Sequence, residues 1–178
     1  MKAGYPMSHI NEADISISPA EEADSAFLRY CCQSDDYRRF INEVTLNPNS
    51  THIISVGRQR IGMVRYDQAS FFSMKVVRPS IYIVKAYRLC SAHAIISSIV
   101  AAASLFQDVD AIQFLVYDDN KPCIALFDSA GIKYEAALPT GDNEHDKLLI
   151  YTLPLQEDAF SFRKALPELS KALWGSLN

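Results

Sequence analysis

The sequence predicts an α+β fold with a central mixed, mostly antiparallel sheet and helices on both of its faces. Two observations carry this prediction. First, short segments in which polar and apolar residues alternate follow one another early in the chain, as they do in antiparallel hairpins. Second, a strand expected at 80–84 is followed by a long apolar helix at 92–106 and by a strand at 111–116, and such a crossover makes the two strands parallel.

The first half of the chain contains most of the expected strands. We expect a strand at 14–19, helices at 21–32 and 35–44, and extended segments at 52–56, 61–66 and 71–84. Asp35 or Asp36 can cap the second helix, and residues 57–60 form a hairpin turn. We expect the last of these extended segments to be interrupted at Arg78–Pro79.

The second half begins with the apolar helix. Residues 92–106 carry Ala, Ile and Val on nearly every side, which predicts a helix buried on most of its surface. A shorter helix at 123–130 has Pro122 in its first turn and ends at Gly131. The remaining expected elements are strands at 132–137 and 148–153 and a final helix at 160–177.

We divide the chain into a loose N-terminal arm at 1–12, a folded domain at 13–155 and a helical extension of that domain at 156–178. A chain of 178 residues with 49% hydrophobic residues is large enough to bury one sizeable core. The apolar face of the extension could close a homodimer or contact a partner subunit. It could equally pack on its own domain.

Charge and apolar patterning narrow the class of protein. A net charge of −4 argues against a nucleic-acid surface or an anionic membrane as partner. No apolar run reaches the roughly 20 residues that a membrane span needs, and the N-terminus lacks the apolar core of a signal peptide, so we expect a cytoplasmic location. The four cysteines form no Cys-x-x-Cys pair, which indicates reduced thiols and no metal site.

The segment Ser80–Ile96 joins a strand, a turn and the apolar helix. The first N–H groups of a helix are unpaired and its dipole is positive there, so such a junction commonly holds a phosphate. Its sequence resembles the acyl-CoA-binding junction of the GNAT superfamily (the GCN5-related N-acetyltransferases), where Arg/Gln-x-x-Gly-x-Gly/Ala follows the strand. Arg88 occupies the first position of that motif, whereas Ser91 and His93 occupy the two glycine positions.

A second segment, Val116–Ile132, resembles the strand, asparagine and helix that come next in the same family. Asn120 and Gly131 match the family pattern. Phe127 stands where many members have the tyrosine that protonates the leaving thiolate, and we expect its ring in the core. The two segments occur in the family's order, and the resemblance covers residues 14–153.

The resemblance implies that the strands at 80–84 and 111–116 splay apart at their C-terminal ends around the thioester of acetyl-CoA. The residues that it places against this co-substrate are Ile83, Val84, Arg88, Ser91, Ala92, His93 and Asn120. The 80–84 strand would pair with the pantetheine arm through its backbone, and residues 88–93 would hold the pyrophosphate. Ser91 and His93 allow two interpretations: they are adapted ligands that offer a hydroxyl and an imidazolium, or they fill an emptied site.

The motifs do not fix an acid or a base. Tyr82 and Tyr117, together with Tyr134, are candidates for the proton donor, and Glu135 is a candidate acid or base near an expected strand. Attack of an amine on a thioester needs little more than positioning, deprotonation of the amine and a polarising N–H. Missing side-chain acids therefore weaken the case for an enzyme without ending it.

The resemblance gives one principal function and two alternatives. The principal one is an acetyl-CoA-dependent N-acyltransferase that moves an acetyl group to a primary amine of an unidentified small molecule or peptide. The first alternative is a catalytically weak or inactive binding or regulatory protein on the same fold, favoured by the lost glycines and the missing tyrosine. The second is an acyl-CoA-binding protein that uses another acyl donor.

Overall fold

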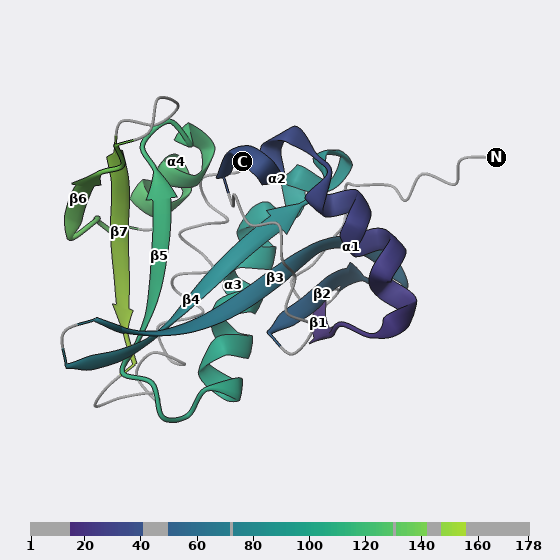
Figure 1. Ribbon diagram of the computed structural model, residues 1–178, viewed down its shortest axis with the longest axis horizontal. Helices are drawn as coiled ribbons and strands as arrows, with labels where there is room; N and C mark the ends of the chain where they lie inside the picture. Colours follow the sequence, from purple (N-terminus) through teal and green to yellow (C-terminus); the bar gives the residue numbers. More distant parts are fainter. Residues whose placement is uncertain (1–14, 41–49, 72, 130, 142–146, 156–178) are drawn as a thin grey trace.

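The computed structural model describes residues 15–40, 50–71, 73–129, 131–141 and 147–155 (Figure 1). The strands are β1 (Ile15–Pro19), β2 (Thr51–Val56), β3 (Gln59–Phe71), β4 (Met74–Ile83), β5 (Ala111–Tyr117), β6 (Ala136–Pro139) and β7 (Lys147–Pro154). The helices are α1 (Ser25–Cys32), α2 (Asp35–Phe40), α3 (Ser91–Leu105) and α4 (Lys121–Ser129), with 3₁₀ turns at Glu22–Asp24 and Lys85–Cys90. The predicted N-terminal arm, the end of the second helix and the final helix lie outside the described residues.

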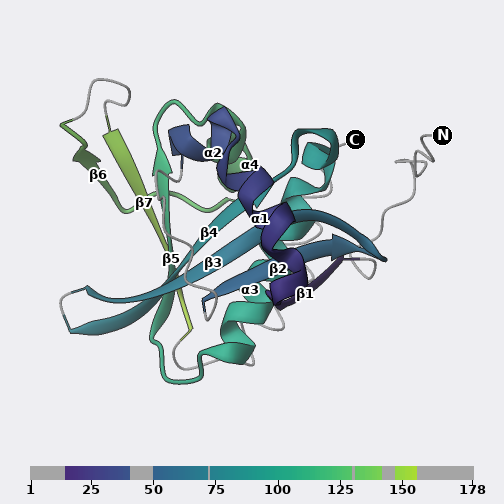
Figure 2. The same cartoon turned by 45° about the vertical axis from the view of Figure 1, so that its right-hand side comes forward.

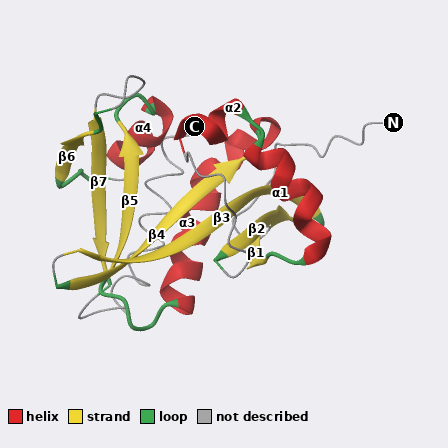
Figure 3. Ribbon diagram, in the orientation of Figure 1, coloured by secondary structure: helices red, strands yellow, loops and turns green. Residues whose placement is uncertain are grey.

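One sheet holds all seven described strands, in the order β1-β2-β3-β4-β5-β7-β6. Every neighbouring pair is antiparallel except β4 and β5, which are parallel, so the predicted fold class is confirmed. The parallel pair is joined only at Val76–Ala111 and Val77–Ile112. Beyond these residues the two strands diverge toward their C-terminal ends, as Figures 1 and 3 show, and the predicted splay is confirmed.

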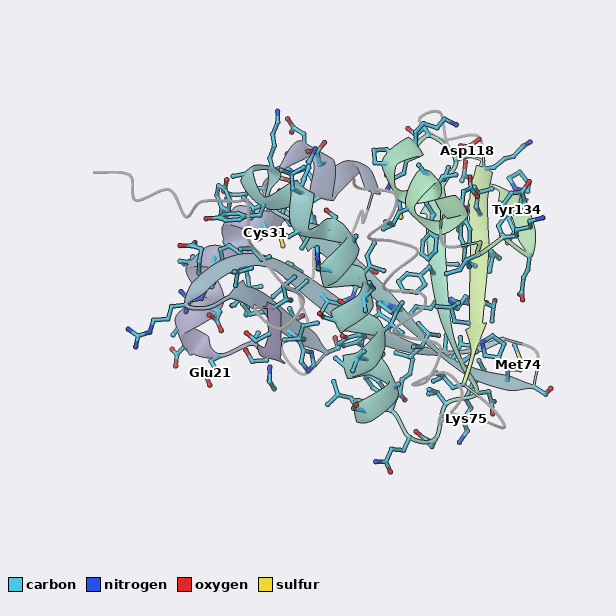
Figure 4. All side chains as sticks on the ribbon, turned by 180° about the vertical axis from the view of Figure 1, so that it is seen from behind. Glu21, Cys31, Met74, Lys75, Asp118 and Tyr134 are labelled. Carbon is cyan, nitrogen blue, oxygen red and sulfur yellow. The ribbon has the colours of Figure 1, made fainter. Side chains whose placement is uncertain are left out.

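Helices cover both faces of the sheet because successive strand residues point to opposite sides. On one face, side chains of α1 and α2 pack on Ile53, Met63 and Tyr82. On the other face, α3 and α4 pack on the alternate residues, such as Ile54 and Val64. Figure 2 shows α1 and α3 on opposite sides of the sheet, and Figure 4 shows the α3 face from behind.

The apolar helix is buried as predicted. The residues of α3 that pack into the molecule are Ala92, His93, Ala94, Ile96, Ser98, Ile99 and Ala102. The hydroxyl of Tyr66 in β3 donates to the carbonyl of Ser98, 3.0 Å away, which ties the helix to the sheet. By length and composition the whole segment Lys85–Leu105 could cross a membrane, but half of it is buried inside the molecule, as in the core helix of a folded domain.

Two expected boundaries are wrong. β4 runs through Arg78–Pro79 without interruption, and β3 extends to Phe71, so the two strands form one long hairpin. The strand expected at 132–137 begins only at Ala136, because the chain after α4 must first cross to the sheet edge. The end of α4 itself is as predicted: Gly131 has a φ of 71°, and the N–H of Ile132 donates to the carbonyl of Phe127 at 3.0 Å, closing the helix.

Candidate functional site: the opening between β4 and β5

Beyond Val77, the backbone groups along the edge of β4 that faces β5 form no ladder with another described strand. The N–H of Val84 donates to the carbonyl of Ile61 in β3 at 2.8 Å, and the carbonyl of Lys75 accepts from the N–H of Asp110, next to β5, at 2.8 Å. Because N–H and C=O groups alternate between the two edges of a strand, Ile81 and Ile83 direct theirs toward the side of β5. No described strand pairs with β4 there.

Pro79 explains why β4 can be continuous and still separate from β5. It lies on the same edge as Ile81, two residues after Val77, where its missing N–H removes the next possible bond to β5. Its partner in register on β3 is Tyr66, whose own N–H donates to the carbonyl of Ser50 at 2.9 Å. Neither residue therefore needs a bond to the other, and proline is tolerated inside the sheet.

A hydrogen bond between side chains lies where β4 and β5 begin to diverge, a point that we call the vertex of the opening. Arg78 and Gln113 directly follow the last paired residues of β4 and β5. The Nε of Arg78 donates to the Oε1 of Gln113 at 2.9 Å, and the Nε2 of Gln113 lies 3.5 Å from the Oγ1 of Thr152 in β7. Gln113 is only 1% exposed. The sequence interpretation missed these residues, although an arginine and a glutamine within otherwise apolar strands are a detectable signal.

Arg88 lies in the 3₁₀ turn between β4 and α3, and its side chain extends from this turn to α2. Its guanidinium forms an ion pair with the carboxylate of Asp36 in α2, and both side chains are half exposed. The pair ties the turn to the helices on the opposite face of the sheet from α3. A phosphate bound by Arg88 would share this guanidinium with Asp36 or displace the carboxylate.

The two glycine positions of the motif lie in ordinary helical backbone. Ser91 has φ −60° and ψ −40°, so a side chain there costs no backbone strain, and its N–H already donates to the carbonyl of Arg88. In the same turn the N–H of Tyr87 donates to the carbonyl of Val84 at 2.8 Å. Ala92 and His93 are each 5% exposed and lie within the first turn of α3. Steric approach, and not backbone conformation, is the remaining reason for glycine at these positions.

Two of the three catalytic candidates lie on strands, Tyr82 in β4 and Tyr117 in β5, and Glu135 directly precedes β6. Tyr82 is buried beneath α1 and α2, with its ring 5.7 Å from that of Tyr37, and burial raises its pKa while a hydrogen bond to Ser34 opposes the rise. Tyr117 ends β5 and is partly buried beside the opening. Glu135 is exposed, and its N–H donates to the carbonyl of Ile150 in β7, so β7 lies between it and β5. The structure does not bring Glu135 to the opening.

Asn120 lies in the short link between β5 and α4, directly before the first residue of the helix. Its carbonyl accepts from the N–H groups of Cys123 and Ile124, each at 3.1 Å, and its own N–H donates to the carbonyl of Tyr117 at 3.0 Å. These bonds fix Asn120 beside the C-terminal end of β5, where the strand has left β4. The residue is partly buried.

Phe127 belongs to the core, as predicted. Its ring is 2% exposed, lies 5.2 Å from that of Phe114 in β5 and stacks at 4.4 Å on that of Tyr151 in β7. The hydroxyl of Tyr151 is buried without a hydrogen-bond partner among the described residues, and burial raises its pKa to about 12. The tyrosine stays protonated near neutral pH.

The cysteines offer no nucleophile or metal centre in the described part of the chain. All four are free thiols, and burial raises the pKa of both Cys31 and Cys123 to about 12. Within the described ranges, no three His, Cys, Asp or Glu side chains gather where they could hold a metal ion. The adjacent pair Cys31–Cys32 packs with α1 against the sheet.

Comparisons with known proteins support the fold assignment. No protein-family model and no curated protein sequence matches the chain. Among solved structures, RimJ from Mycobacterium smegmatis in complex with CoA-disulfide is similar with a TM-score of 0.67 at 11% identity, over 91% of this chain and 88% of that one. Spermidine N-acetyltransferase from Vibrio cholerae, with CoA and spermine bound, has a TM-score of 0.66 at 11% identity, over 80% and 96%.

A GNAT-family acetyltransferase from Bacillus anthracis gives a TM-score of 0.63 at 12% identity, over 81% of this chain and 96% of that one. Identities this low establish the fold alone. The strand order, the single parallel pair and its splay are thus those of the GNAT acetyltransferases, and this chain has the GNAT fold.

Proposed function

We propose that this chain is an acetyl-CoA-dependent N-acyltransferase that moves an acetyl group to a primary amine. The open edge of β4 carries the proposal. Ile81 and Ile83 direct backbone donors and acceptors into the space between diverging strands, and an extended arm with amide groups can pair with such an edge as an added strand would. The pantetheine arm of acetyl-CoA has this chemistry.

The proposed orientation follows from where charge can be held. Arg88 and the start of α3 lie at the C-terminal end of β4, and a cationic side chain beside a helix N-terminus suits a pyrophosphate. From Ile83 back to Val77 is six residues, or roughly 20 Å of strand. An arm anchored at Arg88 would thus carry its acyl end toward the vertex at Val77. The Vibrio cholerae and Mycobacterium smegmatis structures, both solved with CoA species, support the choice of co-substrate.

The reaction needs few catalytic groups from the protein. The neutral amine attacks the thioester carbon, a C–N bond forms, the C–S bond breaks, the amine loses a proton and the thiolate gains one. An N–H on the open edge of β4, such as that of Ile81, would stabilise the developing oxyanion. Tyr117, at the end of β5, and Tyr82, on β4, remain our candidates for the proton that the thiolate receives.

A second function, a catalytically weak or inactive binding protein, is favoured by three observations. The arginine proposed for phosphate is already paired with Asp36, and the N–H of Ser91 is already bonded to Arg88. Phe127 stands in the core where many GNAT enzymes have a tyrosine. A GNAT-fold protein that has lost the ability to bind acetyl-CoA would show these features.

Calorimetric titration with acetyl-CoA and with CoA tests the proposal. Wild type should bind both, and Arg88→Ala should weaken binding about 10- to 100-fold, since a charged hydrogen bond contributes about 1.5–3 kcal/mol. Asp36→Asn should tighten binding because it frees Arg88. Arg58→Ala, at the exposed β2–β3 turn, is the control. No binding of any acyl-CoA would leave the inactive protein as the better account.

Glycine at both Ser91 and His93 separates the two interpretations of these residues. If the side chains block the phosphate, the double change should raise affinity for CoA. If they are adapted ligands, it should lower affinity and reduce its pH dependence between 6 and 7, where a histidine ordinarily titrates. Thermal unfolding must accompany the titration, because each glycine in a helix costs about 1 kcal/mol.

A further inference from the structure

We infer that the acceptor amine carries a carboxylate, which Arg78 binds. The inference rests on the proposed function, since it places the acceptor at the same opening between β4 and β5. It goes further in naming a substrate class: an amino acid or short peptide with an apolar side chain and a free carboxylate. Four observations on the sheet face that carries α1 and α2 support it.

The first observation is how Arg78 is held. Its Nε donates to Gln113, which is buried and reaches Thr152, so the base of the guanidinium is fixed across three strands. Its two Nη groups form no hydrogen bond or ion pair with any described residue. A guanidinium anchored through Nε presents its two terminal nitrogens as a fork, and this fork matches the two oxygens of a carboxylate.

The second observation concerns the nearest acid. Asp67 in β3 is the register partner of Arg78 and could neutralise it. Its Oδ2, however, accepts from the Nε and Nη2 of Arg65 at 2.8 and 2.6 Å, and Arg65 has a side chain only 5% exposed. The charge of Asp67 is thereby neutralised by Arg65. The three residues Arg65, Asp67 and Arg78 together keep one net positive charge, which lies at Arg78.

The third observation is position. Arg78 directly follows the last β4–β5 pair, and the acyl end of a bound arm would point toward that pair. A positive charge near an incoming amine also disfavours its protonated form. A bound carboxylate neutralises this charge, so the repulsion acts chiefly on acceptors that lack one, such as polyamines.

The fourth observation is the apolar surface beside Arg78. Leu115 and Tyr117 lie on the same face of β5 as Gln113, because residues two apart point the same way. Leu115 is 39% exposed although it sits in an internal strand. An apolar side chain of the acceptor would cover this leucine while its carboxylate meets Arg78.

The test is calorimetric titration of wild type, with and without CoA, using L-leucine, L-phenylalanine and leucyl-leucine, their C-terminal amides, and spermidine. We expect each carboxylate to bind at least 10-fold more tightly than its amide, and spermidine to bind most weakly. Arg78→Gln should remove the preference, Arg78→Lys should keep part of it, and Asp67→Asn should increase it. Arg58→Gln is the control for lost surface charge. Thermal unfolding shows whether each variant is folded.

The outcomes separate this inference from the proposed function. Selective binding of carboxylates without any affinity for acetyl-CoA would support Arg78 as an anion site and reject the acyltransferase. Binding of acetyl-CoA with equal affinity for acids and amides, or with a preference for spermidine, would overturn the inference and keep the acyltransferase. Equal loss of acid and amide binding in a folded Arg78→Gln protein would also overturn it, because a structural role predicts that result.

Discussion

The two edges of β4 behave differently although they belong to one strand. Toward β3, the register is continuous from Gly62–Ile83 to Phe71–Met74. Toward β5, it ends after Val77–Ile112. β3 joins β4 through a hairpin turn, whereas β5 arrives after the α3 crossover and meets Pro79, which has no N–H to offer. The candidate site thus arises from the incomplete pairing of an otherwise regular strand.

The largest effect on stability should come from the packing of α4 against β5, the strand that lies beside the open edge of β4. Phe127 lies against Phe114 of β5 and Tyr151 of β7, and replacing it by alanine should lower the free energy of unfolding by about 3–5 kcal/mol. Urea denaturation measures this loss. Phe127→Leu, the matched control, should lose less than half as much. A loss below 1 kcal/mol would show that β5 does not depend on α4.

A nearly comparable loss of stability should come from the closed edge of β4, which is the edge that pairs with β3 along its whole length. A Cβ built on Gly62 would lie 2.2 Å from the carbonyl oxygen of Tyr82 and 2.7 Å from the Cδ1 of Ile83. Gly62→Ala should therefore force the strands apart and cost about 2–3 kcal/mol in urea denaturation. At Gly57 a Cβ would meet nothing within 4 Å, and only its φ of +56° opposes alanine, so Gly57→Ala should cost about 1 kcal/mol. Equal losses in the two variants would contradict this explanation.

The closed and open edges also differ in how well the sequence predicts them. The strand–helix–strand order at 80–116 correctly indicated a parallel pair, because a crossover allows little else. Pro79, in contrast, suggested an interruption of β4. Local propensity cannot reveal that the missing N–H faces the opening, since that depends on which edge pairs with β3.

The candidate site was predictable only in part. Its location after residues 80–84 followed from the motif, and the core position of Phe127 was expected. The pairing of Arg88 with Asp36 was not, because these residues are far apart in sequence and meet only when α2 lies over the turn. The bond between Arg78 and Gln113 was missed for the same reason, since it depends on the register of two strands that are joined by a helix.

A smaller effect, confined to the closed side, should appear as pH falls. His52 in β2 is 7% exposed, its ring lies 5.2 Å from that of Tyr66, and burial lowers its pKa while a backbone hydrogen bond at Ser50 opposes the shift. Below about pH 6.5 the imidazole of His52 takes up a proton in the unfolded chain but resists it in the folded chain. The free energy of unfolding should therefore decrease as the pH falls below about 6.5, and His52 should not change it above that pH.

The contribution of His52 between pH 7.5 and 5.5 can be at most about 1.4 kcal/mol. It is measured as the difference in pH dependence between wild type and His52→Gln in urea denaturation. The affinity for acetyl-CoA should keep its pH dependence in that variant, because β2 is two strands away from the open edge of β4. Identical stability profiles for the two proteins would remove His52 from this role.

The smallest effect should come from Pro79→Ala, which tests the comparison directly. Alanine gives the unfolded chain more freedom, which should cost about 0.4–1 kcal/mol, and it supplies the missing N–H on the open edge. In hydrogen-exchange measurements, we expect the new amide at 79 and those of Ile81 and Ile83 to exchange faster than those of Ser80 and Tyr82, which face β3. Acetyl-CoA, if it pairs with this edge, should slow exchange at Ile81 and Ile83 and leave Ser80 unchanged. Protection at residue 79 equal to that at Ser80, without ligand, would mean that one N–H suffices to extend the β4–β5 ladder. The opening would then be a property of the proline, and not of the crossover.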